Sequence, residues 1–152
     1  MKLINNVITK PALFICLALL TACNYAPVSP GWELRDPDLK EIAMIRADPH
    51  WGAVVIYNPN ICDEMGDACG FFRLQAYAHK HLNHSLLAEP ELYPNSLIAK
   101  ADCWAAQYGK SNEIRAAIDI LGDEDRNPDW KIHGNAKQRA ENITACAEIA
   151  GK

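Results

Sequence analysis

Apolar residues recur every three to four positions along four stretches of the C-terminal two thirds of the chain, the spacing of amphipathic helices. These stretches cover residues 71–87, 95–109, 111–122 and 135–150, and Gly or Pro stands between them, as expected where helices end. The positions expected to face the core are Phe71, Leu74, Ala78, Leu82, Ser85, Leu97, Ala101, Trp104, Tyr108, Ile114, Ala117, Ile118, Leu121, Ala136, Ala140, Ile143, Ala147 and Ala150.

Strand patterns come before these helices. The run Ala53–Tyr57 is apolar and β-branched and lies between turn sequences, so it predicts a strand. Residues 32–47 leave two interpretations open, a helix that begins near Asp36 or a strand over Ile42–Ile45. Residues 60–70 predict a loop or a short helix. The whole pattern predicts an α+β, mostly helical fold, in which a short N-terminal sheet or hairpin is followed by four helices.

The N-terminus has the composition of an export signal. Two lysines are its only charges, and residues 12–20 form a continuous apolar run. This run is too short for a transmembrane anchor, which needs about 20 apolar residues, and the small residues before Cys23 favour cleavage. The sequence LTAC at residues 20–23 resembles the lipobox of bacterial lipoproteins, in which the Cys is acylated and the segment before it is removed.

The lipobox resemblance implies three parts: a signal peptide over residues 1–22, a lipidated tether over residues 23–31 and a domain over residues 32–152. Acylated Cys23 would anchor the chain to a lipid bilayer, because several acyl chains attach a protein stably. By resemblance to enterobacterial sorting, in which Asp after the Cys retains a lipoprotein in the inner membrane, Asn24 implies the periplasmic face of the outer membrane.

Charge argues against one class of partner. The full chain has 15 Lys+Arg and 19 Asp+Glu, and without the two lysines of the signal the balance is 13 against 19, a net charge of −6 with neutral His. An acidic domain of this kind is unsuited to nucleic acid, so we expect no nucleic-acid partner. The roughly 130 residues that remain after cleavage suit one domain with a modest core.

Four cysteines lie in the predicted domain: Cys62, Cys69, Cys103 and Cys146. In an exported protein they predict two disulfides, with three possible pairings. Cys62 and Cys69 flank a short acidic loop and suit a local bridge, and a Cys103–Cys146 bridge would staple the last helix to the second core helix. The alternative is a four-thiolate zinc site, which the lack of any CxxC spacing disfavours.

Residues 78–84 read AHKHLNH, and residues 101–106 read ADCWAA. This layout resembles the HExxH-type zinc metallopeptidase-like domains of bacterial envelope proteins, in which a pattern like AHExAHH on one helix is followed by ExxADCxAA on the next. The tail also resembles the family, in which a Gly, an inward Arg and a late Cys close the domain. The matching tail residues are Gly134, Arg139, Ile143 and Cys146.

The resemblance implies a zincin-like remnant that lacks most of the chemistry. In the active enzymes both His of HExxH bind zinc and the Glu is the general base. His79 matches the first His, but Lys80 stands at the base, Asn83 at the second His and Ile98 at the third ligand, so we expect no catalytic residue. In the family an Asp supports the first His, and Asp102 matches it. We therefore expect Asp102 to hydrogen-bond His79 and raise its pKa.

A second metal hypothesis rests on His81 and His84. Three residues apart on a regular helix, they are neighbours, whereas His79 points about 160° away from His81. With a partner such as His50 or His133, this pair would bind copper, nickel or zinc weakly. The alternative is a polar, partly exposed helix face.

These observations favour a non-enzymatic, membrane-anchored binding or interaction module, a pseudoenzyme that reuses an old cleft for an envelope protein or peptide and needs no cofactor. In the family a strand such as Ala53–Tyr57 lies along the cleft rim, where an extended peptide can pair if the cleft is kept. The favoured alternative is that this strand simply packs in the core. The alternatives are an envelope metal-binding protein that uses His81 and His84, and a peptidase with a rearranged zinc site.

Overall fold

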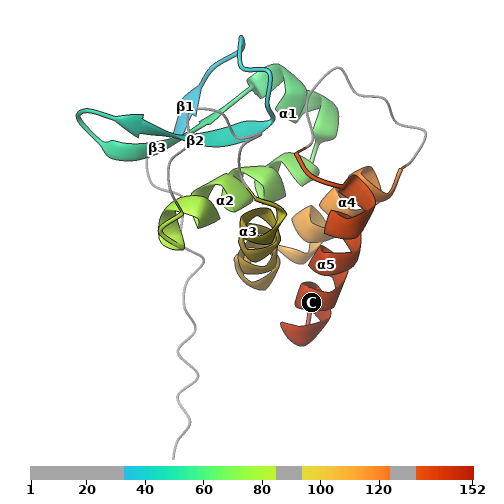
Figure 1. Cartoon of the computed structure of the whole chain (residues 1–152). Coiled ribbons are helices and arrows are strands. Elements are labelled where there is room, and N and C mark those ends of the chain that lie inside the picture. Colours follow the sequence, from blue (N-terminus) through green and yellow to red (C-terminus); the bar gives the residue numbers. More distant parts are fainter. Residues whose placement is uncertain (1–32, 85–93, 124–132) are drawn as a thin grey trace, which may run out of the picture.

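The computed structural model describes residues 33–84, 94–123 and 133–152. The described residues form three strands followed by five helices (Figure 1). These elements are β1 (Glu33–Arg35), β2 (Ala43–Asp48), β3 (Gly52–Tyr57), α1 (Pro59–Met65), α2 (Ala68–His81), α3 (Asn95–Tyr108), α4 (Ser111–Gly122) and α5 (Ala136–Ile149). The predicted α+β, mostly helical class is confirmed, and α1 is the short helix left open in residues 60–70. The predicted signal peptide, Cys23 and the whole of the predicted tether lie outside the described residues.

β3 is the central strand of the sheet, whose order is β1-β3-β2. β1 pairs with it in parallel over Val55–Tyr57, and β2 pairs with it antiparallel along its whole length. Val54, Val55 and Ile56 are buried, as suits β-branched residues in a covered strand. The interpretation of this strand as one that packs in the core therefore holds, and the alternative of a strand along a cleft rim does not, because β1 and β2 flank it.

The ambiguous residues 32–47 contain β1, a turn and β2, so a helix that begins near Asp36 is wrong. The Asp36 side chain instead accepts a hydrogen bond from the Asp38 backbone N–H at 3.1 Å, and the Leu39 N–H donates to the Asp36 carbonyl at 3.2 Å. Such a local bond offers the backbone a turn in place of a helical start.

Asn58 ties this turn to the first helix. Its side-chain oxygen accepts from the backbone N–H groups of Asn60 and Ile61 and so caps α1, whose first residue is a proline. Its side-chain nitrogen donates to the carbonyls of Pro37 and Leu39 at 3.0 and 2.7 Å. A buried carboxamide thereby joins the sheet to the helical part of the domain.

α2 lies in the middle of the molecule, between the sheet and the layer of α3 and α4 (Figure 1). Apolar side chains around much of its circumference are buried, as expected of a helix covered on several sides. α5 packs against α3 and α4. α3, α4 and α5 lie close to their predicted ranges, whereas α2 begins three residues before Phe71 and ends six residues before the predicted end, at His81.

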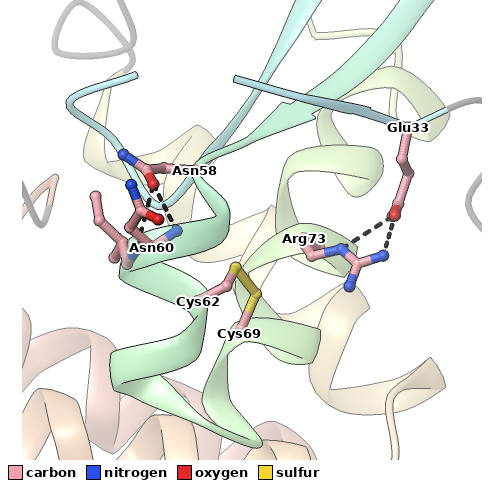
Figure 2. Close-up of a disulfide and its surroundings, with 7 residues drawn as sticks. Glu33, Asn58, Asn60, Cys62, Cys69 and Arg73 are labelled. Carbon is pink, nitrogen blue, oxygen red and sulfur yellow. Dashed lines mark hydrogen bonds and ion pairs between the residues drawn. A yellow bond between two sulfur atoms is a disulfide. The ribbon is translucent and has the colours of Figure 1, made fainter. Parts of the chain in front are cut away.

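Both predicted disulfides are confirmed. Cys62–Cys69 joins α1 to α2 with a Cα–Cα distance of 5.0 Å, and Cys103–Cys146 joins α3 to α5 at 5.2 Å. Figure 2 shows the first bridge, with Arg73 of α2 reaching the Glu33 carboxylate at the edge strand β1. The four-thiolate zinc alternative is therefore wrong.

Candidate functional site

The predicted metallopeptidase helix ends in the middle of the motif. Leu82 is the C-cap of α2, and Asn83 has a φ of 54°, the left-handed conformation that Asn tolerates better than most residues. The Asn83 N–H donates to the Lys80 carbonyl at 3.1 Å, and the His84 N–H donates to the His79 carbonyl at 2.9 Å. These two bonds form a Schellman motif, with Asn83 in the place that Gly usually takes.

This turn brings His84 back onto His79. Their Nδ1 atoms are 3.1 Å apart, and the rings meet edge to face with centroids 4.9 Å apart. The Nε2 atom of His79 is also 3.1 Å from the Nε2 atom of Gln75, one turn earlier on α2. Because a hydrogen bond needs one donor and one acceptor, one of the two Nδ1 atoms carries a proton and the other does not.

Both rings of this pair favour the neutral form. His79 is 4% exposed, and burial lowers its pKa from 6.5 to about 4, assisted by the charges of His84, Arg139 and His133. Burial, then the charge of Lys100, lowers the pKa of His84. The prediction that the His79 pKa is raised is therefore wrong, because desolvation and neighbouring cations act on it instead of a carboxylate.

Asp102 is paired with a different residue from the one that the resemblance implies. Its two carboxylate oxygens accept from Nε and Nη2 of Arg139 at 2.8 and 2.7 Å, a bidentate pair that joins α3 to α5. Asp102 is fully buried and Arg139 is 8% exposed. Burial raises the pKa of the Asp102 carboxyl, against the opposing effect of its bonds to Arg139. Asp102 therefore pairs with Arg139 where the resemblance predicted His79.

The other positions of the supposed zinc site have structural roles. The Lys80 ammonium donates a hydrogen bond to the Ala53 carbonyl at 3.1 Å, in the part of β3 that does not pair with β1. Asn83 shapes the helix end, and Ile98 is a buried side chain of α3. These positions lack the ligands and the base that a zinc peptidase needs, so the residues do not fit that chemistry.

His81 and His84, the predicted pair, contact different residues, and the helix ends between them. His81 lies on Trp104, with ring centroids 4.9 Å apart, while His84 contacts His79. His50, one suggested partner, is exposed in the turn between β2 and β3. Among the described residues, no three His, Cys, Asp or Glu side chains come together as a metal site.

A cavity of about 210 Å³ opens between α3 and α5, beside the pair of Asp102 and Arg139. Most of its lining residues have polar side chains. The lining residues are Asn95, Ser96, Ile98, Ala99, Asp102, Gly134, Asn135, Gln138, Arg139 and Asn142. The carboxamide side chains of this lining were not among the predicted site residues. The signal that could have found them is that Asn95 and Asn135 stand at the predicted starts of two helices.

No family model, no curated protein and no solved structure matches this chain. The relation to HExxH metallopeptidases and to lipoproteins therefore stays a prediction from the sequence. In the part of the chain that the structure describes, none of the helices is both long and apolar enough to cross a membrane.

Proposed function

We propose that this chain is a lipid-anchored protein of the bacterial envelope whose domain binds a partner and does not hydrolyse peptides. The lipobox at residues 20–23 supports the anchor, and Asn24 supports the outer membrane. The partner is an envelope protein or a peptide, bound non-covalently.

One observation supports the non-enzymatic part above all. Apart from His79, the positions that the resemblance gives to zinc chemistry are occupied by residues with structural roles. Lys80 bonds the sheet, Asn83 ends the helix and Ile98 fills the core, while Asp102 is held by Arg139. A base and three ligands cannot be recovered from such residues without refolding the end of α2.

The anchor is tested by Cys23→Ser in the full chain. We expect the wild-type chain to incorporate labelled palmitate and to sediment with outer membranes, and the variant to do neither. Cys16→Ser is the matched control, because this cysteine lies in the segment that is removed. Membrane association of Cys23→Ser without acylation would contradict the proposed anchor.

The binding function is tested in cells by photo-crosslinking. A benzophenone amino acid replaces Gln138, at the cavity between α3 and α5, or Asp119, an exposed residue of α4 that is not part of the cavity lining. We expect a discrete crosslinked product from position 138 and none from position 119. Equal products from both positions, or none from either, would argue against a partner at this face.

Peptidase activity is tested with the purified full chain and added zinc on a mixed peptide library. We expect no cleavage above that of the His79→Gln variant. Cleavage that the wild-type chain shows and His79→Gln lacks would establish the rearranged peptidase instead.

Metal binding is a second candidate function, and the contact between His79 and His84 favours it. Two imidazole nitrogens 3.1 Å apart, each about 2.05 Å from a metal ion, would subtend about 98° at that ion, between square-planar and tetrahedral geometry. Elemental analysis of the chain purified without a tag or chelator tests this. Copper, nickel or zinc that His84→Ala removes and His81→Ala retains would support it.

A further inference from the structure

The cavity between α3 and α5 contains a cation whose hydrogen bonds are incomplete. The Arg139 guanidinium has five N–H donors, of which Nε and Nη2 each donate one to Asp102 and Nη1 donates one to the His133 carbonyl at 3.1 Å. One N–H on Nη1 and one on Nη2 have no acceptor among the described residues. Donors buried this deeply are normally satisfied, so this guanidinium has capacity for two further bonds beside the cavity.

Polar side chains at the cavity mouth are also available to hydrogen-bond a ligand. The side chains of Asn95, Ser96 and Gln138 line the cavity and make no hydrogen bond to any residue that the structure describes. Gly134 lies on the α5 side of the cavity, and its φ of +77° would strain any other residue. A Cβ there would be in ordinary contact with Asn95 Oδ1 at 3.4 Å and Ile98 Cδ1 at 3.5 Å.

The electrostatics of the lining suit an anion with a single charge. Asp102 is the one acidic residue of the lining, and both of its oxygens are engaged by Arg139. The first turns of α3 and α5 line the same cavity, and each helix start adds a partial positive charge of about half a unit. Because the ion pair is neutral as a whole, these two contributions match a monoanion better than a dianion.

We propose that this cavity binds a carboxylate group. The carboxylate would accept the remaining N–H groups of Arg139, and the exposed carboxamides and the Ser96 hydroxyl would hold the atoms next to it. A volume of about 210 Å³ admits a small carboxylic acid or the C-terminal residue of a peptide, and recognition of the carboxylate is common to both. This inference deepens the proposed binding function, on which it rests, by naming the site and the ligand chemistry.

The full chain, purified in detergent, is titrated with each probe, and binding is measured by calorimetry and by the NMR shifts of its side-chain amides. The probes are N-acetylglycine, N-acetylglycinamide, a hexapeptide with a free C-terminus, the same hexapeptide amidated, and inorganic phosphate. We expect both free carboxylates to bind and to shift the side-chain amides of Asn95 and Gln138, and both amides to bind at least tenfold more weakly. Tighter binding of the hexapeptide than of N-acetylglycine would identify a peptide end as the source.

The decisive variant is Gln138→Glu. Gln138 is the third residue of α5 after the Asn135 cap, where Glu favours the helix, so the variant should fold at least as well as the wild-type chain. A carboxylate at the cavity mouth should nevertheless weaken binding of the free carboxylates about tenfold through repulsion. Gln107→Glu is the matched control, the same change at an exposed position near the other end of α3, and should leave binding unchanged.

Three results would overturn the inference: no binding of either carboxylate, equal binding of carboxylate and amide, or equal weakening by Gln138→Glu and Gln107→Glu. Phosphate binding tighter than carboxylate binding would overturn the choice of ligand class. Photo-crosslinks from position 138 that persist while carboxylates fail to bind would refute this inference alone and leave the proposed binding function standing.

Discussion

The resemblance assigns the C-terminal end of α2 and Asp102 of α3 to one zinc site, yet the structure builds the two places in different ways. Between α3 and α5, a bidentate ion pair and a disulfide connect two regular helices through the adjacent residues Asp102 and Cys103 of α3. At the end of α2, one residue in the left-handed conformation stops the helix and redirects His84. Side-chain positions on a continuing helix follow from sequence spacing, whereas those beyond a helix end do not.

The two regions therefore differ in what they do. The contact between α3 and α5 holds residues that stabilise the fold, and the end of α2 does not have the regular turn that HExxH chemistry requires. Stability should therefore depend most on the α3–α5 contact, and the local geometry of the histidines should depend on Asn83.

Arg139→Met should have the largest effect, because it leaves the Asp102 carboxylate buried without its cation. Loss of one partner of a buried pair costs about 3–5 kcal/mol of the free energy of unfolding. Denaturant unfolding of the two proteins measures the loss. Adding Asp102→Leu to Arg139→Met should restore much of it, since no unpaired charge then remains.

Arg73→Met is the matched control for that variant. It removes the ion pair with Glu33, in which the arginine side chain is 32% exposed, so we expect a loss of about 1 kcal/mol or less. Equal losses from Arg73→Met and Arg139→Met would refute the special role of the α3–α5 contact.

Replacing Cys103 and Cys146 together by Ala should lower the free energy of unfolding by about 4 kcal/mol, by the chain-entropy relation for a separation of 43 residues. Replacing Cys62 and Cys69, separated by 7 residues, should cost about 2.5 kcal/mol on the same relation. Denaturant unfolding of the two double variants provides the comparison. A larger loss of unfolding free energy on removal of Cys62–Cys69 would show that this disulfide also stabilises the folded state directly, beyond restricting the unfolded chain.

Acid should destabilise the end of α2 through His79. Its folded-state pKa of about 4 lies below the 6.5 of the unfolded chain, so the unfolded state binds the extra proton between these values. The stabilisation is complete above pH 6.5 and is lost as the pH falls towards 4. The free energy of unfolding should fall by up to about 3 kcal/mol in that window, at about 1.4 kcal/mol per pH unit.

His79→Gln should flatten this pH profile, and His81→Gln, a change at an exposed position on the same helix, should leave it as in the wild-type chain. Unfolding curves recorded between pH 4 and 7 measure both. An unchanged slope in His79→Gln would assign the acid sensitivity to another group.

Sequence patterns alone predicted the regular parts of the molecule. The helices α3, α4 and α5 have strong apolar periodicity and Gly, Ser or Asn at their ends, and the two disulfides join pairs whose predicted elements could meet. The order of the strands was not predictable, because the parallel pairing of β1 with β3 joins segments about 20 residues apart and leaves no local pattern.

The candidate site was predicted only in part, and each error has a physical cause. A periodic pattern through residue 87 hid the stop at Asn83, since Asn is also tolerated inside a helix. The resemblance gave His79 as the partner of Asp102. Arg139, which was predicted only to point inward, reaches Asp102 from α5, and its guanidinium binds both carboxylate oxygens, which an imidazole cannot do.

The smallest expected effect on stability concerns Asn83, and it tests the left-handed backbone conformation at the end of α2. At a φ of 54°, Asn83→Gly should be neutral or slightly stabilising, whereas Asn83→Ala should cost about 1 kcal/mol, because a β-carbon without a polar group is disfavoured in the left-handed region. Thermal unfolding of the wild-type chain and the two variants measures this order.

Asn83→His places a histidine at the position that matches the second zinc ligand of HExxH. It should nevertheless create no zinc site, because residue 83 lies beyond the last turn of α2. Zinc bound by Asn83→His, and lost again when His79 is also changed, would mean that α2 can continue through residue 83 and that a single substitution is enough to form the HExxH-like histidine pair.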